Sequence, residues 1–398
     1  MGKIGYESHF KSKRTDGRHI SSLAAFTDML RSTDPKLSLP EELDRESFLF
    51  WQSRVKEKFR ELLRMPEIKL QEPPKKLYSE KREGYTAEKW ELYPNEYEAV
   101  PFLVLIPEGA SAKNQTPGVI CLPGSIHSKE FIADEPLLEP YNCRFEKVPE
   151  RNKMALYLVK NGMTAFVFDN LAIAELGLPT SSPDVDVWNC HSRVEMVFGY
   201  LQAGVCYPGI ATYHLLSFLQ YISCFDFVDK DRLGVCAHSL GTEAAMSLAL
   251  LSEDIKAIVF NDFLCNGRRR YSSITEVSEG NMELNIGIWH VIPGMWEYFD
   301  FPDLCAAIAP KYITFNEGGA DECFEVVKRA YRVSGAMENL SVSHYPKYAK
   351  EEDRKHHGKV PRYGLTSEEF YEISYCDAPD HSFREEPSVR MLKKAFGM

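Results

Sequence analysis

A serine with small neighbours lies in the stretch VCAHSLGTEAAM, residues 235–246. Ser239 follows an apolar run typical of a buried strand and precedes an apolar run with helical spacing. Ala237 and Gly241 flank it, and their small size permits a tight turn between strand and helix. This context predicts a nucleophilic serine, with Ala237 as the one departure from the pattern G-x-S-x-G. The alternative is a hydroxyl that only caps the helix.

A serine hydroxyl becomes a strong nucleophile when a base removes its proton, and in this strand–turn–helix arrangement the base comes later in the chain. His381 lies in CDAPDHSF, a loop before the last helical segment, and we predict it as the base. His344 falls in a strand-like run, and His356 and His357 lie in the charged stretch KEEDRKHHGK. The side chain of His238 is expected to point away from the turn.

The base in turn needs a carboxylate to orient it, which is expected after a late strand. The stretch KYITFNEGGAD contains a strand, two glycines and Asp321 in that order, so we predict Asp321 as the acid. Asp321 could also cap the helix that follows it. Glu317, Glu322 and Asp262 are the alternatives for the acid.

Backbone N–H groups must stabilise the negative charge that develops on the substrate oxygen. We predict the N–H of Leu240 as one donor, because it follows the nucleophile at the positive end of a helix dipole. The second donor is expected in the loop CLPGSIHSKE, at Ser125 or Ile126, with Gly124 as a further candidate. His127 in this loop is predicted to bind substrate; an ordinary polar loop residue is the alternative.

An aromatic-rich segment, WHVIPGMWEYFDF, follows the strand that comes after the serine helix. We predict that Trp289 and Trp296 contact the substrate, for example by stacking on a sugar ring. Packing of the same segment on the core is the alternative.

The elements that must position these residues alternate along the chain. Apolar strand-like runs are separated by helical segments, and the clearest strands span 99–106, 118–123, 164–170, 232–238, 256–262 and 311–317. This alternation predicts an α/β fold with a mostly parallel central sheet and helices on both faces. Functional residues of such sheets gather beyond the carboxyl ends of the strands, where Ser239 lies.

The first 82 residues have a more charged, helical character. The stretch FWQSRVKEKFRELLRMP repeats apolar residues at helical spacing, and Pro66 and EPPKK end it. We therefore predict an N-terminal helical extension over residues 1–82, packed on a catalytic domain over residues 83–398. A helix that binds a partner protein is the alternative for this segment.

The composition of the chain limits the kinds of partner and the cellular compartment that we expect. The chain of 398 residues has a net charge of −11, which argues against nucleic acid as a partner. It shows neither a signal peptide nor an apolar run long enough to span a membrane, so we expect no membrane association. The ten cysteines include no CxxC pair and are expected to be thiols in a reducing compartment, which predicts a cytoplasmic protein. Formation of a homo-oligomer is left open.

Several motifs together resemble a known family. The segments AHSLGTEAAM, FNDFLC, HVIPGMWEYFDFPDLCAAIAP, EGGAD and DAPDHSF resemble the acetyl xylan esterase-like and dienelactone hydrolase-like α/β-hydrolases, in particular esterase-like proteins of gut bacteria associated with glycan use. The similarity runs from about residue 82 to the C-terminus, and FWQSRVKEKFRELLRMP resembles the N-terminal helix of these proteins. The resemblance implies an α/β-hydrolase fold with Ser239, Asp321 and His381 as the triad. Many relatives carry HGxGG in the oxyanion loop, where this chain has LPGSIHSK.

These observations predict a bacterial serine hydrolase that cleaves a carboxylic ester through an acyl-enzyme, without a metal or organic cofactor. A small acyl or acetyl ester of a sugar or related small molecule is the expected substrate. The same triad would also serve a thioesterase, a lactonase or an amidase. A non-catalytic binding protein with the hydrolase fold is the alternative from another class.

Overall fold

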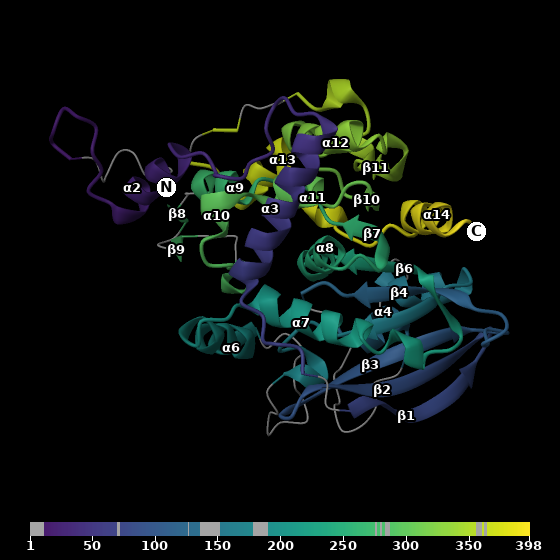
Figure 1. Cartoon of the computed structure of the whole chain (residues 1–398). Helices are drawn as coiled ribbons and strands as arrows, with labels where there is room; N and C mark the ends of the chain where they lie inside the picture. Colours follow the sequence, from purple (N-terminus) through teal and green to yellow (C-terminus); the bar gives the residue numbers. More distant parts are fainter. Residues whose placement is uncertain are drawn as a thin grey trace.

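The computed structural model describes residues 12–69, 72–125, 127–135, 152–177, 190–274, 277–278, 281–282, 287–355, 360–361 and 364–398. Within these residues the chain forms one large sheet, one small hairpin and helices that cover the sheet (Figure 1). The strands are β1 (Glu72–Arg82), β2 (Tyr85–Asn95), β3 (Glu98–Pro107), β4 (Thr116–Leu122), β5 (Thr164–Phe168), β6 (Val228–His238), β7 (Ile255–Asn261), β8 (Val277–Ser278), β9 (Asn281–Met282), β10 (Tyr312–Phe315) and β11 (Leu340–Val342).

The large sheet has nine strands in the order β1-β2-β3-β5-β4-β6-β7-β10-β11. The pairs β1–β2, β2–β3 and β3–β5 are antiparallel, and every further pair from β5 to β11 is parallel. Strands β8 and β9 form the separate hairpin. The mostly parallel sheet predicted from the alternation of strands and helices is confirmed.

Alternate side chains of the central strands enter two cores, one on each face of the sheet. On β3, Phe102 and Val104 belong to one core, and Leu103 and Leu105 belong to the other. Helices therefore cover both faces, as predicted. The first core includes side chains of α3 (Arg45–Leu63), α7 (Tyr207–Leu219), α8 (Gly241–Leu251), α11 (Phe301–Ala306) and α12 (Asp321–Ser334). The second includes side chains of α4 (Lys129–Ala133), α5 (Met154–Lys160) and α14 (Glu385–Phe396).

The remaining α-helices lie outside these two layers or at their rims. They are α2 (Ser22–Arg31), α6 (Cys190–Gln202), α9 (Gly267–Ser273), α10 (Met295–Tyr298) and α13 (Ser367–Ile373). α2 packs against α9, at a distance from the sheet (Figure 1). None of the described helices is both long and apolar enough to cross a lipid bilayer.

The N-terminal segment contributes to the core as well as to the surface. α3 is the amphipathic helix expected from the sequence, and its apolar face is buried against the main body through Phe48, Trp51, Val55, Phe59 and Leu63. The end of the predicted helical extension differs, because residues 72–82 form β1 of the large sheet. Most side chains of this edge strand are exposed, so no apolar alternation marks it.

Strands β6, β7 and β10 run parallel and end at one edge of the sheet. His238 of β6 is paired with Asn261 of β7, and Phe260 of β7 with Phe315 of β10. The residues that follow these pairs therefore leave the sheet next to one another. They include Ser239 after β6 and Glu317 after β10.

Candidate active site

Ser239 occupies the sharp turn between β6 and α8. Its φ is 52°, in the left-handed region that a non-glycine residue rarely adopts, and its N–H donates to the carbonyl of Asn261 at 3.1 Å. The Ser239 carbonyl accepts hydrogen bonds from the N–H of Thr242 at 2.9 Å and from its hydroxyl at 2.6 Å. Strain of this kind is typical of functional sites and persists only when the surroundings enforce it. The geometry is that of a nucleophile elbow.

Gly241 shows why this turn requires small residues. A Cβ atom at this position would lie 2.7 Å from the carbonyl oxygens of both Leu122 and Pro123, at the end of β4. These are contacts with backbone atoms, which cannot rotate away. The close approach of α8 to β4 that positions Ser239 therefore depends on a glycine here.

His381 is oriented by Glu317. The Nδ1 of His381 is hydrogen-bonded to Oε2 of Glu317 at 2.5 Å, so its Nε2 is the nitrogen left for proton transfer. Glu317 is completely buried, two residues beyond the end of β10. Its Oε2 also accepts from the hydroxyl of Tyr345 at 2.6 Å, and its Oε1 accepts from Nδ2 of Asn261 at 2.7 Å. These bonds fix the carboxylate and, through it, the histidine ring.

Asp321 was the acid predicted from the sequence, and the structure corrects this assignment. Asp321 is the first residue of α12, and its carboxylate forms an ion pair with Arg354, whose Nε lies 3.1 Å from both oxygens. The carboxylate that reaches His381 comes from Glu317, which the sequence had left as an alternative. The physical reason is that Asp321 lies four residues after Glu317, in the first turn of α12, where Arg354 binds its carboxylate.

Asp262 is a second carboxylate close to His381. Burial raises the pKa of Asp262 to about 6, although the nearby charges of His381 and Arg270 favour its ionised form. Burial alone would lower the pKa of His381, but the hydrogen bond that its Nδ1–H donates to Glu317 and the negative charges of Asp262 and Glu317 outweigh burial and raise this pKa to about 9. The imidazolium form of His381 is thus strongly stabilised.

His238 lies closer to the base than expected. Its ring centroid is 4.5 Å from that of His381, and its Nδ1 lies 3.0 Å from Nδ2 of Asn261. Burial, together with the charge of His381, lowers the pKa of His238 well below its ordinary value. A neutral ring is therefore packed against the base.

Among the described residues, one group of three side chains has ligand atoms close enough to hold a metal ion. The atoms of His238, Glu317 and His381 lie within 4.8 Å of one another. However, Glu317 already accepts direct hydrogen bonds from four donors: His381, Tyr345, Asn261 and the N–H of Ser382. The donor set fits a hydrogen-bonded triad better than a metal centre.

The predicted oxyanion donors lie at the same site. Leu240 and Ser125 line one cavity with Ser239, and within the described part of the chain neither backbone N–H donates a hydrogen bond. Asn170 binds the carbonyls of Pro123 and Gly124 at 2.8 and 3.0 Å. Because N–H and C=O point in opposite directions across a trans peptide, holding the Gly124 carbonyl directs the Ser125 N–H the other way. Ile126, the alternative second donor, lies outside the described residues.

A buried arginine, Arg193, holds the loop that contains Ser125. The Nη2 of Arg193 donates to the carbonyl of Ser125 at 2.6 Å, and its guanidinium lies 5.1 Å from the ring centre of Trp289. Arg193 is completely buried and does not line the cavity. Its position links the oxyanion loop to the aromatic segment. No local sequence pattern marks Arg193, since the contact joins residues 68 positions apart.

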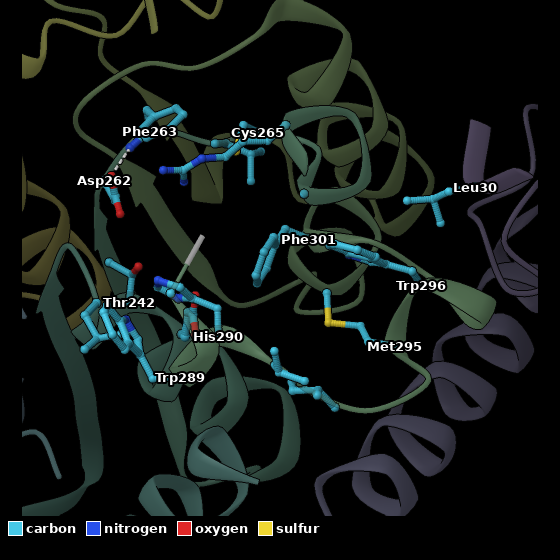
Figure 2. A pocket seen from close by; sticks show the side chains of 18 of the residues that line it. Leu30, Thr242, Asp262, Phe263, Cys265, Trp289, His290, Met295, Trp296 and Phe301 are labelled. Atoms are coloured by element: carbon cyan, nitrogen blue, oxygen red, sulfur yellow. Dashed lines mark hydrogen bonds and ion pairs between the residues drawn. The ribbon is translucent and has the colours of Figure 1, made fainter. Parts of the chain in front are cut away.

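The cavity that contains Ser239 and His381 has a volume of about 950 Å³ (Figure 2). Trp289 and Trp296, which were predicted to contact substrate, both line the cavity, whereas His127 does not. His127 instead stacks on Phe131, with ring centroids 4.0 Å apart. Figure 2 shows Leu30, from α2, on the side of the pocket opposite to Trp289. The sequence did not predict that α2 helps to form the wall of this cavity.

Comparison with known proteins shows the family to which the chain belongs. A family model described as the Abhydrolase family matches residues 6–394. The chain belongs to the Abhydrolase family. A solved structure from Bacteroides fragilis, provisionally named an acetyl xylan esterase, is 33% identical to this α/β-hydrolase, with 96% of this chain and 97% of that chain covered and a TM-score of 0.88. The resemblance expected from the sequence motifs is thereby confirmed.

More distant structures share the fold. A methylesterase is 15% identical with a TM-score of 0.55, over 93% of this α/β-hydrolase and 72% of that chain. A glucuronoyl esterase from Solibacter usitatus is 14% identical with a TM-score of 0.51, over 81% and 95% of the two chains. No curated protein sequence matches significantly.

Proposed function

We propose that this α/β-hydrolase cleaves carboxylic esters through an acyl-enzyme, with Ser239 as nucleophile, His381 as general base and Glu317 as the orienting acid. The observation that carries the proposal is the combination of the strained φ of 52° at Ser239 with the His381–Glu317 hydrogen bond, both at one cavity. A serine that only capped α8 would not need this conformation.

The first half of the reaction forms the acyl-enzyme. Nε2 of His381 removes the proton of Ser239 as its Oγ attacks the ester carbonyl. The N–H groups of Leu240 and Ser125 stabilise the tetrahedral oxyanion. The same imidazolium then gives its proton to the departing alcohol, so that the C–O bond breaks and the acyl group stays on Ser239.

The second half regenerates the enzyme. His381 deprotonates a water molecule that attacks the acyl-enzyme, and the carboxylic acid leaves as Ser239 recovers its proton. Glu317 accepts the hydrogen bond from Nδ1 of His381 and keeps the imidazole in the tautomer with the proton on Nδ1. None of these steps requires a cofactor.

For the substrate we propose a small acyl or acetyl ester of a sugar or related small molecule. The name of the Bacteroides fragilis protein supports this class, as do Trp289 and Trp296 in the cavity wall, which offer apolar faces for a ring. We also place the enzyme in the cytoplasm, since eight cysteines of the described residues are free thiols.

Labelling with a fluorophosphonate tests the nucleophile. Intact-mass measurement should show one adduct on the wild type, none on Ser239→Ala and slower labelling of His381→Ala and Glu317→Gln. Asp321→Asn is the matched carboxylate control and should be labelled at the wild-type rate. A folded wild type that forms no adduct would contradict the proposal and favour a non-catalytic binding protein.

A further inference from the structure

Arg270 brings a positive charge into the catalytic cavity. It belongs to α9, which follows β7, and it lines the same cavity as Ser239 and His381. Its guanidinium lies 5.6 Å from the centre of Phe263 and 5.5 Å from that of Tyr371, two rings that contact each other edge to face with centroids 5.6 Å apart. The two rings attract the cation and restrict the positions that the side chain can take.

The hydrogen-bonding capacity of Arg270 is largely unused. Its Nη2 donates to the hydroxyl of Tyr371 at 3.0 Å, and within the described part of the chain its Nε is buried without a partner. Among the described residues, no carboxylate oxygen comes within 4.0 Å of its nitrogens. Asp262, the nearest candidate, uses Oδ1 to accept from the N–H of Phe263 at 2.8 Å. Nη1 and Nη2 together carry four N–H donors, of which Tyr371 accepts one, so the others remain for an acceptor in the cavity.

The neighbouring arginines of α9 differ in this respect. Arg269 forms an ion pair with Glu322, and Arg268 donates to the carbonyls of Leu30 and Thr33 in the N-terminal segment. Neither lines the cavity. Arg268 and Arg269 thus have structural partners away from the cavity, whereas Arg270 lines the cavity that contains Ser239.

We propose that Arg270 binds a carboxylate of the substrate, so that the preferred substrates are esters that carry a free carboxylate group. This inference rests on the proposed esterase function and narrows its substrate class. A planar guanidinium and a carboxylate form two parallel hydrogen bonds, which are stronger than hydrogen bonds between neutral groups. The rest of the ester would occupy the apolar part of the cavity.

Matched ester pairs test this preference. In one pair the carboxylate is on the alcohol side, with 4-acetoxybenzoate against the neutral 4-acetoxybenzamide. In the other it is on the acyl side, with monomethyl glutarate against methyl glutaramate. The wild type should favour the acidic member of at least one pair about tenfold or more in kcat/KM, the size expected for one charge-assisted hydrogen-bonded contact.

Variants of α9 assign the preference to one side chain. Arg270→Met and Arg270→Gln should reduce the ratio of acidic to neutral kcat/KM to about one, and Arg270→Lys should keep part of it. Arg269→Met is the control, since it removes an arginine of the same helix outside the cavity. A second measurement needs no variant: free glutarate should inhibit the wild type competitively, and glutaramide should not.

The outcomes separate this inference from the proposed function. Equal rates on both members of each pair, or a preference that survives in Arg270→Met, would overturn the role of Arg270 while leaving ester hydrolysis intact. Absence of hydrolysis of all four esters, with no fluorophosphonate adduct on Ser239, would instead refute the proposed function.

Discussion

The carboxylate of Glu317 is hydrogen-bonded to Nδ1 of His381 at 2.5 Å, although Asp321 lies only four residues further along the chain. Three other donors hold Glu317 in this orientation: Tyr345, Asn261 and the N–H of Ser382. The acid of the proposed triad is therefore fixed by a network that includes two neighbouring strand ends and the loop before α14.

Replacement of this acid should remove most of the activity. In Glu317→Gln an NH2 group replaces one carboxylate oxygen. The side chain can then no longer accept hydrogen bonds from all four donors, so the tautomer and orientation of His381 are lost. We expect kcat to fall by about 10³- to 10⁴-fold. Asp321→Asn should retain kcat within a few fold, with folding of both variants checked by urea unfolding. An inactive Asp321→Asn beside an active Glu317→Gln would reverse the assignment.

The activity of the enzyme should fall with decreasing pH at an unusually high pH for a histidine base. The base acts only when neutral, so activity is present above the pKa of His381 and is lost as the pH falls through it. With this pKa raised to about 9, the acid limb of kcat/KM should have its midpoint well above 6.5. Asp262→Asn should move the midpoint to lower pH, because it removes one of the charges that stabilise the imidazolium.

The control for the pH profile is Asp321→Asn, which should leave the midpoint unchanged. A wild-type midpoint at or below 6.5, or a shift to higher pH in Asp262→Asn, would contradict this electrostatic account.

Substitution of Gly241 should disturb the elbow. A Cβ at this position would press on two backbone oxygens, so we expect Gly241→Ala to lower the free energy of unfolding by about 1–3 kcal/mol and to reduce kcat. Gly199→Ala, on an exposed turn of α6 with open space around it, should instead be neutral or stabilising by up to about 1 kcal/mol. Urea denaturation measures both, and equal stabilities would show that α8 can shift without cost.

Loss of Arg193 should impair the oxyanion loop. Arg193→Met removes the hydrogen bond to the Ser125 carbonyl and so loosens the residue whose N–H is the proposed second donor. We expect kcat to fall by about 10- to 100-fold with KM nearly unchanged, because the donors act on the charge of the transition state. Arg193→Lys should restore part of kcat. A Met variant that is folded, with unchanged kcat, would exclude this positioning role.

The sequence predicted the central fold and pointed to the serine and histidine of the proposed triad, because each depends on a local pattern. The strands and helices around Ser239 follow apolar periodicity, and His381 lies in a short loop before α14. The choice between Glu317 and Asp321 had no local signal. It depends on where β10 ends and on the ion pair of Asp321 with Arg354, which joins residues 33 positions apart.

Side-by-side strand ends explain why two acids lie near the base. β7 and β10 are in register with Phe260 opposite Phe315, and each pair member is followed by asparagine and then an acid. Asp262 and Glu317 therefore occupy equivalent positions on adjacent strands. The sequence predicted both strands, each followed by asparagine and an acid. It did not predict the register between the two strands, because parallel pairing is established by the tertiary fold.

The wall that α2 contributes to the cavity has a consequence for the history of such enzymes. α2 lies apart from the sheet, and its contacts with α9 include the hydrogen bond from Arg31 to Ser273 at 2.6 Å. Changes at Phe26, Met29 or Leu30 alter the space offered to a ligand without touching the strands that hold the triad. Duplicated genes with this architecture can thus diverge in their choice of substrate by drift in one surface helix, while the catalytic groups stay under selection.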